Sequence, residues 1–566
     1  MSYSKGRSFI PRSINSKYVV FTVAVVLLIL LIAFPLGIMF YKSFAVEGQI
    51  SLGNYIEVFT ERRNLLPVIN TLKLGGLTVL FSTIIGVIAA WLVARTDLPY
   101  KGLLDTLFLM PYMIPPFIGA IAWIQLMSPR VGYLNRFWMQ LFDTMQTPFN
   151  IYSLSGIVWV MSLHNYPFVY IIVRGALERM DPSLEEVAHM SGAGRLKVMW
   201  DITLRLVMPS ITGGMLIVFI YTIANFGIPA LIGMRARFFV LTTQIYSYIY
   251  TGDFSGIKLA ASLSTLLMFI AGAGVILNRW YLRKKQYTVI SGKSVHPNLV
   301  RLRKWRTPIF VMVLVFFVIA VIAPLISVFS SAFLRAWGVA FKLENLTFDN
   351  FYYILFEYDL TRLAIRNSVI LALSAATLTT IIGSIAAYIN VKTELRGRQI
   401  IDVLATLPYA IPGTVVALSM ILAWSGAYKL NLYNTFWIIL IAYIARYMFF
   451  AFRNVSSSLS QIHPSLEEVA MVSGADWLRN FRDIVIPLIK PGLMASWFLI
   501  FMPTLRELTI SILLWGPQTP TIGVAVFEMQ DAGYYQNSAA LASIILMVVL
   551  VGNYLLRKVM GVKISM

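Results

Sequence analysis

The side chains that most often carry chemistry are sparse in this sequence. Its 566 residues include no cysteine, which excludes disulfides and thiolate metal sites. Gly292-Lys293-Ser294 matches the end of a phosphate-binding loop, but Tyr287 stands where that loop needs its first glycine. The four histidines are scattered without metal-ligand spacing: His164, His189, His296 and His463. The sequence therefore predicts no catalytic residue, no metal site, no cofactor and no ATP-binding loop of this kind.

Paired carboxylates do occur, in a motif that the chain carries twice. Residues 185–192 read Glu-Glu-Val-Ala, three further residues and Gly, and residues 467–474 repeat this pattern. The copies are 282 positions apart (467 − 185), and the same offset separates Pro209 from Pro491. An ungapped match of this length indicates an internal duplication.

The local physics of each copy predicts a short helix, a sharp turn and a second helix. A proline precedes each motif, and Ser183 with Glu186 has the spacing of a capping box. Carboxylates in the first turn favour the positive end of the helix dipole. Gly192 and Gly474 fall where a left-handed residue ends a helix. A plain surface hairpin is the structural alternative, but two copies in equivalent loops favour a docking surface that is used twice.

A second group of polar side chains lies inside apolar stretches, where an ionised group is costly. In the 282-residue frame, His164 aligns with Arg446 and Asn225 with Glu507, which follows Arg506. We expect these five residues to line a translocation pathway. Interhelical contacts that fix packing are the alternative.

The elements that must position these groups are membrane spans. Hydrophobic residues make up 58% of the chain and charged residues only 13%, a composition typical of a polytopic membrane protein. About twelve apolar runs are long enough to cross a bilayer: 18–40, 68–94, 104–127, 153–173, 209–233 and 257–278, then 309–333, 366–391, 403–424, 435–453, 491–514 and 539–556. This predicts an all-α fold of two parallel six-helix repeats.

The distribution of basic residues predicts a cytoplasmic amino terminus. Residues 1–17 carry four basic residues and no acidic one, and the stretch 279–307 is strongly basic, whereas 515–537 has no lysine or arginine. Both motif loops then lie in the cytoplasm. The net charge of +21 reflects this topology and contact with anionic lipid, not nucleic-acid binding.

The repeat also sets the domain organisation. Residues 70–120 and 367–417 align with an offset of 297 (367 − 70), so the first half holds fifteen extra residues (297 − 282), which we place in 128–152. We predict a first repeat over residues 1–285, a basic cytoplasmic linker over 286–307 and a second repeat over 308–566.

The Glu-x-Ala-x-x-x-Gly pattern followed by an apolar helix and a proline resembles the cytoplasmic signature loop of permease subunits of binding-protein-dependent ABC importers. The resemblance implies the type I importer fold with both permease halves fused in one chain. It also implies that each loop docks one copy of a separate ABC ATPase, which binds ATP and Mg, and that an extracytoplasmic binding protein delivers the solute. The docking residues would be Glu185, Glu186, Ala188 and Gly192 in one loop and Glu467, Glu468, Ala470 and Gly474 in the other. Val187 and Val469 depart from the commoner alanine, and Arg205 replaces the proline found at Pro487, which suggests that the two sites are not equivalent.

Among importers with fused halves, the chain looks most like ferric iron permeases of the bacterial inner membrane. The similarity lies in Arg506-Glu507-Leu508 leading into Leu513-Leu514 and in residues 241–246. The same broad family includes permeases for phosphonates, sugar phosphates, thiamine and polyamines, and these stretches do not distinguish among them. Ferric iron or an anionic or chelated solute is therefore the expected cargo, with those solutes as alternatives. A secondary transporter driven by an ion gradient is a further alternative, and a channel or a structural membrane protein a weaker one.

Overall fold

The computed structural model describes residues 12–559 except 47, 182, 253, 285–298, 340, 427–428 and 476. Most of the predicted basic segment over residues 1–17 and most of the predicted linker therefore lie outside the described residues. The boundary predicted at residue 285 also falls among them.

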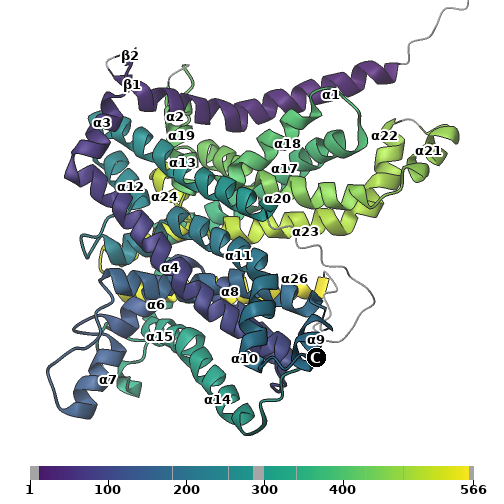
Figure 1. The fold of residues 1–566 in the computed structure, drawn as a ribbon. Coiled ribbons are helices and arrows are strands. Elements are labelled where there is room, and N and C mark those ends of the chain that lie inside the picture. The colour runs from purple at the N-terminus through teal and green to yellow at the C-terminus, as the bar shows by residue number, and fades with distance from the viewer. Residues whose placement is uncertain are drawn as a thin grey trace, which may run out of the picture.

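The described chain is almost entirely helical, with one two-residue hairpin of antiparallel strands (Figure 1). Labels with η mark π-helical or 3-10 turns. The first half comprises α1 (Arg12–Leu28), η1 (Ile29–Ala33), α2 (Phe34–Phe44), β1 (Ala45–Val46), β2 (Gln49–Ile50), α3 (Gly53–Thr60), α4 (Arg62–Arg95), α5 (Lys101–Met113), α6 (Pro116–Met127), α7 (Tyr133–Phe142), α8 (Leu154–Arg179), α9 (Ser183–Met190), α10 (Arg195–Val198), η2 (Met199–Thr203), α11 (Leu204–Ala224), η3 (Pro229–Gly233), α12 (Leu241–Thr251) and α13 (Phe254–Lys284).

The second half comprises η4 (Arg303–Trp305), α14 (Arg306–Phe317), η5 (Val318–Ile322), α15 (Ala323–Ala332), η6 (Leu343–Asn345), α16 (Asp349–Tyr352), η7 (Tyr353–Glu357), α17 (Asp359–Lys392), α18 (Arg398–Thr406), η8 (Leu407–Ala410), α19 (Gly413–Trp424), α20 (Phe436–Ser460), α21 (Pro464–Val472), α22 (Trp477–Asn480), η9 (Phe481–Val485), α23 (Ile486–Leu505), α24 (Ser511–Leu514), α25 (Ile522–Asp531) and α26 (Tyr535–Val559).

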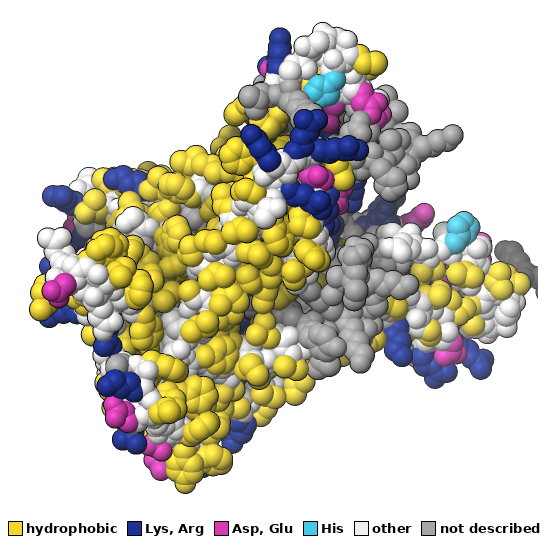
Figure 2. Space-filling view, turned by 90° about the horizontal axis from the view of Figure 1, so that it is seen from below, with side chains coloured by type: hydrophobic (Ala, Val, Ile, Leu, Met, Phe, Trp, Pro, Cys, Tyr) yellow, Lys and Arg dark blue, Asp and Glu magenta, His cyan; other side chains and the backbone are white. Residues whose placement is uncertain are grey.

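The predicted membrane spans are confirmed. Ten described helices are long and apolar enough to cross a membrane, and twelve spans result if each of two bent helix pairs counts as one. Large apolar side chains such as Val23, Leu80, Ile84 and Val311 are exposed along these helices, as a hydrocarbon environment requires. Figure 2 shows this apolar surface covering the middle of the body on the side in view, with charged side chains gathered toward its two ends.

Two predicted spans, 104–127 and 403–424, are broken rather than continuous. α5 and α6 meet at 94°, and the helix over residues 398–410 meets α19 at 116°. The cause is local, because Ile114 and Ile411 each precede a proline, which disfavours the helical conformation of the residue before it, and both are extended.

The fifth span of each half is shorter than predicted at its carboxyl end. α11 ends at Ala224 instead of residue 233, and α23 ends at Leu505 instead of residue 514. In both halves the next helical turn starts afresh after a polar residue, Asn225 or Glu507, that accepts backbone N–H groups.

The duplication extends to the irregular segments. α4 and α17 both have 34 residues. The π-helical turns η2 and η9 repeat at the 282-residue offset (481 − 199). The expected insertion over 128–152 contains α7, whereas the described residues between α19 and α20 of the second half form no helix.

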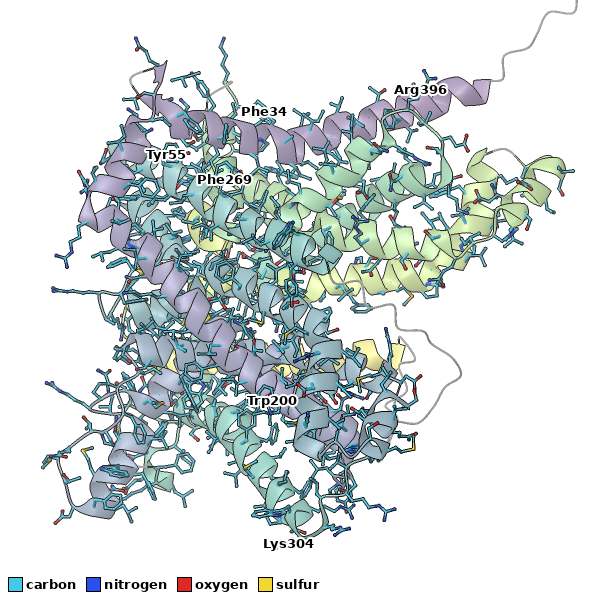
Figure 3. All side chains as sticks on the ribbon, viewed as in Figure 1. Phe34, Tyr55, Trp200, Phe269, Lys304 and Arg396 are labelled. Carbon is cyan, nitrogen blue, oxygen red and sulfur yellow. The ribbon has the colours of Figure 1, made fainter. Side chains whose placement is uncertain are left out.

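The two halves are interlocked through their first spans. Within each half the core is a packed triple, α4 with α8 and α11, and α17 with α20 and α23. However, α2 of the first half packs on α19 of the second, where Phe34 (Figure 3) lies 5.3 Å from Trp424 between ring centroids. Reciprocally, α15 of the second half packs on α6 of the first. Each repeat therefore covers the other.

Candidate functional site

The two motif loops form helical hairpins at the same end of the molecule. α9 with α10 and α21 with α22 project at the right of Figure 1, away from the end that carries α3, α7 and the β hairpin. This shared position agrees with the prediction that both loops face one side of the membrane. Which side it is follows only from the distribution of basic residues in the sequence.

Side chains cap the first turn of both motif helices. In the first loop, the Ser183 N–H donates to Asp181 Oδ1 at 2.9 Å, and this bond lowers the pKa of the Asp181 carboxyl. In the second loop, the Ser465 N–H donates to His463 Nδ1 at 3.3 Å. Asp181 and His463 are 282 positions apart (463 − 181). The residue two places before the serine therefore accepts the first-turn N–H in both copies.

The helix ends follow the prediction. Gly192 and Gly474 have φ of +83° and +86°, the left-handed region that ends a helix. The Gly192 N–H donates to the His189 carbonyl and the Ala193 N–H to the Ala188 carbonyl, each at 3.0 Å. A Cβ at either glycine would meet no atom within 4 Å, so glycine is required here by backbone conformation and not by space.

The first glutamate of each motif points inward and joins a long span. In the first half, Glu185 forms an ion pair with Arg95, the last residue of α4, and accepts a hydrogen bond from the Thr203 hydroxyl. Arg95 and Glu185 are separated by about ninety residues in the chain. Only the fold brings them together.

The second half repeats this anchor with different side chains. Glu467 Oε1 lies 2.8 Å from Lys392 Nζ, at the end of α17, and Glu467 Oε2 accepts from the Tyr388 hydroxyl at 3.2 Å. Arg95 and Lys392 are 297 positions apart (392 − 95), the offset of the long spans. We call α9 and α21, the first helices of the two predicted docking loops, the docking helices. Equivalent buried ion pairs tie them to equivalent helix ends.

The outer face of each docking helix is apolar. Leu184, Val187 and Met190 are exposed on α9, and Leu466, Val469 and Val472 occupy the same positions on α21. Of the eight predicted docking residues, Glu185, Ala188, Glu467 and Ala470 face inward, whereas Glu186, Glu468, Gly192 and Gly474 are exposed. The predicted docking role of the eight stays a prediction. The exposed face could have been predicted from the sequence, because apolar residues stand at i, i+3 and i+6 in each motif.

Three of the five predicted pathway residues lie at the two breaks in the third spans. Arg446 donates to the Pro408 carbonyl at 2.6 Å and to the Ile411 carbonyl, and the His164 ring lies beside the Pro111 carbonyl at the equivalent break. Arg506 crosses between the halves and donates to the Met113 carbonyl. These basic groups satisfy backbone carbonyls that the broken helices leave without intrahelical partners.

Asn225 and Glu507 lie directly after the fifth spans, where they accept backbone N–H groups of the turn that follows. Asn225 Oδ1 accepts the Ile228 N–H at 3.1 Å. The two carboxylate oxygens of Glu507 accept the Ile510 N–H at 2.8 Å and the Ser511 N–H at 3.0 Å. Both residues cap the helical turn that follows a fifth span. Their place in a pathway stays a prediction.

Comparison with known proteins agrees with the duplicated, interlocked membrane fold. Residues 82–283 and 379–561 match the family described as binding-protein-dependent transport system inner membrane component, so one copy matches in each half and the matches cover more than half of the chain. The chain belongs to this permease family. It is thus a multi-pass inner-membrane permease of the ABC importer class with both halves fused in one chain.

Curated relatives of this permease include iron transporters. A ferric transport system permease of Actinobacillus pleuropneumoniae is 27% identical over 529 residues, which cover 93% of this chain and 76% of the relative. An Fe(3+)-transport system permease of Haemophilus influenzae is 26% identical over 541 residues, covering 94% and 97%. A molybdenum transport system permease of Escherichia coli is 31% identical over 220 residues, covering 38% and 92%.

Among solved structures, a chain of a bacterial ABC transporter that imports the acidic polysaccharide alginate is similar to part of this permease. It is 21% identical with a TM-score of 0.37, and covers 45% of this chain and 96% of that chain.

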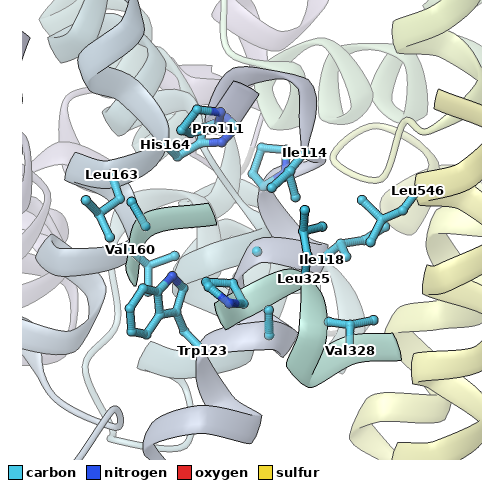
Figure 4. A pocket seen from close by; sticks show the side chains of 15 residues that line it. Pro111, Ile114, Ile118, Trp123, Val160, Leu163, His164, Leu325, Val328 and Leu546 are labelled. Carbon is cyan, nitrogen blue, oxygen red and sulfur yellow. The ribbon is translucent and has the colours of Figure 1, made fainter. Parts of the chain in front are cut away.

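A small cavity of about 30 Å³ lies beside one predicted pathway residue of the permease (Figure 4). His164, Trp123 and Leu163 line it together with Ile118 and Leu546, and its wall is mostly apolar. It has room for no more than about one water molecule. The described residues contain no group of three or more His, Asp or Glu side chains that could hold a metal ion.

Beside the first docking helix of the permease lies a larger cleft of about 580 Å³. Its wall includes Arg95 and Glu185 together with Arg301 and Arg303, from the carboxyl-terminal part of the predicted linker. That segment is held on the end of α4 by the Val300 N–H, which donates to the Arg95 carbonyl at 2.9 Å. In the second half, Tyr388 and Asn480 occupy the positions of Trp91 and Val198 and contact Glu467 instead. The two docking hairpins are therefore not equivalent in their surroundings.

Proposed function

We propose that this permease forms the alternating-access path of an ATP-driven importer powered by two copies of a separate ABC ATPase. One ATPase docks on α9 and the other on α21. An extracytoplasmic binding protein delivers the solute, consistent with the description of the family as binding-protein-dependent. The membrane potential or an ion gradient is not the energy source in this proposal, because a gradient-driven carrier has no need of duplicated docking helices.

The observation that carries the proposal is the construction of the docking helices. Each presents three exposed apolar residues and is tied by a buried ion pair to the end of a 34-residue span. An exposed apolar stripe on a short helix is typical of a protein contact. Because the buried ion pair holds each docking helix against the end of a span, a displacement of the docked partner would also displace that span.

Ferric iron is the cargo that the relatives favour. Two ferric transport permeases align with more than nine tenths of this chain. The molybdenum permease, at higher identity over a shorter stretch, supports an oxyanion as the second candidate. Both candidates fit the expectation of ferric iron or an anionic or chelated solute.

The test places a charge on the apolar stripe of each docking helix. Met190 and Val472 occupy equivalent positions and are 81% and 90% exposed, so Met190→Asp with Val472→Asp leaves the fold unchanged. We expect binding of the ABC ATPase to weaken at least tenfold, about 1.4 kcal/mol, because the carboxylate must be desolvated in the interface. ATP-dependent uptake of ⁵⁵Fe into membrane vesicles should fall with it.

The matched control is Leu343→Asp, at an equally exposed residue (89%) in the loop after α15. This variant should bind the ATPase and import like the wild type. Normal ATPase binding by the doubly charged variant, or uptake that persists without any ATPase, would show that the proposal is wrong.

A further inference from the structure

The breaks in the third spans bring one phenol from each half toward the middle of the molecule. Tyr112 and Tyr409 are 297 positions apart (409 − 112), and each lies edge to face against a phenylalanine of a fourth span. Tyr112 contacts Phe168 at 5.0 Å between ring centroids and Tyr409 contacts Phe450 at 6.2 Å. Tyr112 is 40% exposed although it lies within a membrane-spanning helix pair. Both phenols therefore lie at helix breaks within membrane-spanning helix pairs.

Two guanidinium groups lie next to these phenols. Arg506 donates to the carbonyl of Met113, the neighbour of Tyr112, and Arg446 donates to the carbonyls of Pro408 and Ile411, on either side of Tyr409. Two further phenols, Tyr221 and Tyr447, interact electrostatically with both arginines. We call these six residues the arginine–tyrosine cluster: Tyr112, Tyr221, Tyr409, Arg446, Tyr447 and Arg506.

The charge of this cluster is positive, and one neighbouring carboxylate balances only part of it. Over the part of the chain that the structure describes, neither Arg446 nor Arg506 has a carboxylate within 4 Å. Glu507 interacts electrostatically with Arg446, and its two carboxylate oxygens accept backbone N–H groups. Unpaired guanidinium groups inside a membrane protein are costly, and such groups mark ion and substrate paths.

The donors of the cluster match one chemistry. Guanidinium and phenol groups present N–H and O–H donors that suit the oxygens of a phosphate, carboxylate or similar oxyanion. A bare ferric ion requires oxygen ligands that are negative or easily deprotonated, and two neighbouring guanidinium charges repel it. The cluster therefore selects against a naked cation.

We propose that the arginine–tyrosine cluster is a contact site for the cargo within the path, and that it takes an oxyanion, either free or as the ligand of a ferric ion. This inference rests on the proposed import function and specifies the form in which the cargo crosses. Iron, if it is the cargo, passes together with its anion and not as bare Fe³⁺.

The experiment uses the full permease with its ATPase and binding protein in liposomes. One arm supplies ⁵⁵Fe(III) with ³²P-phosphate or ¹⁴C-citrate as the only chelating anion, and another supplies ⁹⁹Mo-molybdate without iron. Entry of iron and anion in a fixed ratio identifies an iron-carrying anion, and entry of molybdate alone identifies a free oxyanion. Entry of ⁵⁵Fe without either label overturns the proposal.

Variants then locate the contact. Tyr112→Phe removes only a hydroxyl, so assembly with the ATPase should stay within twofold of wild type while the KM for uptake rises at least threefold. Arg506→Gln should lower uptake at least tenfold, and Arg506→Lys, which keeps the charge, should restore part of it. Arg506 also donates a hydrogen bond to the Met113 carbonyl, and Arg506→Gln removes this bond. If that variant fails to assemble, the double variant Tyr112→Phe with Tyr409→Phe tests the role of the cluster. Unchanged KM and selectivity in that double variant would remove the cluster from the path.

A failure of the proposed function gives a different result. In that case the wild-type complex neither binds the ATPase nor imports any of the labelled solutes. If ATP-dependent import is normal in the wild type and unchanged in the cluster variants, only the proposed role of the arginine–tyrosine cluster is wrong.

Discussion

At the scale of single residues, two neighbouring glutamates in each motif have opposite surroundings. Glu467 is buried against Lys392, with both side chains 11% exposed, whereas Glu468 faces outward. A carboxylate that is buried and paired holds a helix in place, and an exposed one is free to meet a partner. The anchoring glutamate and the exposed glutamate can therefore be separated by mutation.

We predict that Glu467→Gln loosens α21 whereas Glu468→Gln does not. Removing one member of a buried ion pair costs about 3 kcal/mol, because the other charge is left uncompensated. Amide hydrogen exchange over residues 464–472 should therefore accelerate by about a hundredfold in Glu467→Gln. Equal exchange rates in the two variants would contradict the anchoring role.

At the scale of elements, each docking hairpin forms because its first helix ends after about two turns. The stop is the left-handed glycine, which lets the chain reverse after two turns and hold the apolar stripe clear of the membrane body. The broken third spans use proline for a similar purpose, and they leave carbonyls that Arg446 and Arg506 satisfy. In both places a helix end creates the functional surface.

We predict that Gly192→Ala with Gly474→Ala weakens ATPase docking. A side chain at positive φ costs about 1–2 kcal/mol, so each hairpin loses its turn geometry in part of the population. Gly194→Ala is the matched control, since Gly194 lies two residues on, has open space around it and is not among the residues with positive φ. Titration of the ATPase against each variant gives the comparison, and equal affinities would place the docking contact elsewhere.

At the scale of the whole molecule, the halves exchange their first spans. α2 covers α19 and α15 covers α6, so neither half buries its own apolar surface completely. A movement of one half therefore displaces a helix of the other half. This interlocking suits a path that opens alternately to the two sides.

We predict that residues 1–285 and 286–566, co-expressed as separate chains, copurify and import. The contact surface between the halves, including Phe34 against Trp424, does not depend on the linker. Removing residues 1–44 from the first chain should reduce copurification at least fivefold, because α19 then loses its cover. Copurification that is indifferent to this truncation would contradict the interlocking.

The sequence alone determined the duplication, the twelve spans, the left-handed glycines and the apolar body of this protein. These features follow from short-range rules, since the 282-residue offset, the span length and the glycine that ends a helix are all visible within or between short stretches of the chain. The family could likewise be predicted from its signature loop.

Only the tertiary structure decided which glutamate faces inward, where the fifth spans end and what the intramembrane arginines bind. The local sequence does not determine the direction of Glu185, which faces inward because it pairs with Arg95 at the end of α4. The hydrogen-bond partner of Arg506 is the Met113 carbonyl, which belongs to the other half. Which side of a helix is buried depends on the segments that pack against it, and here those segments lie far away in the sequence.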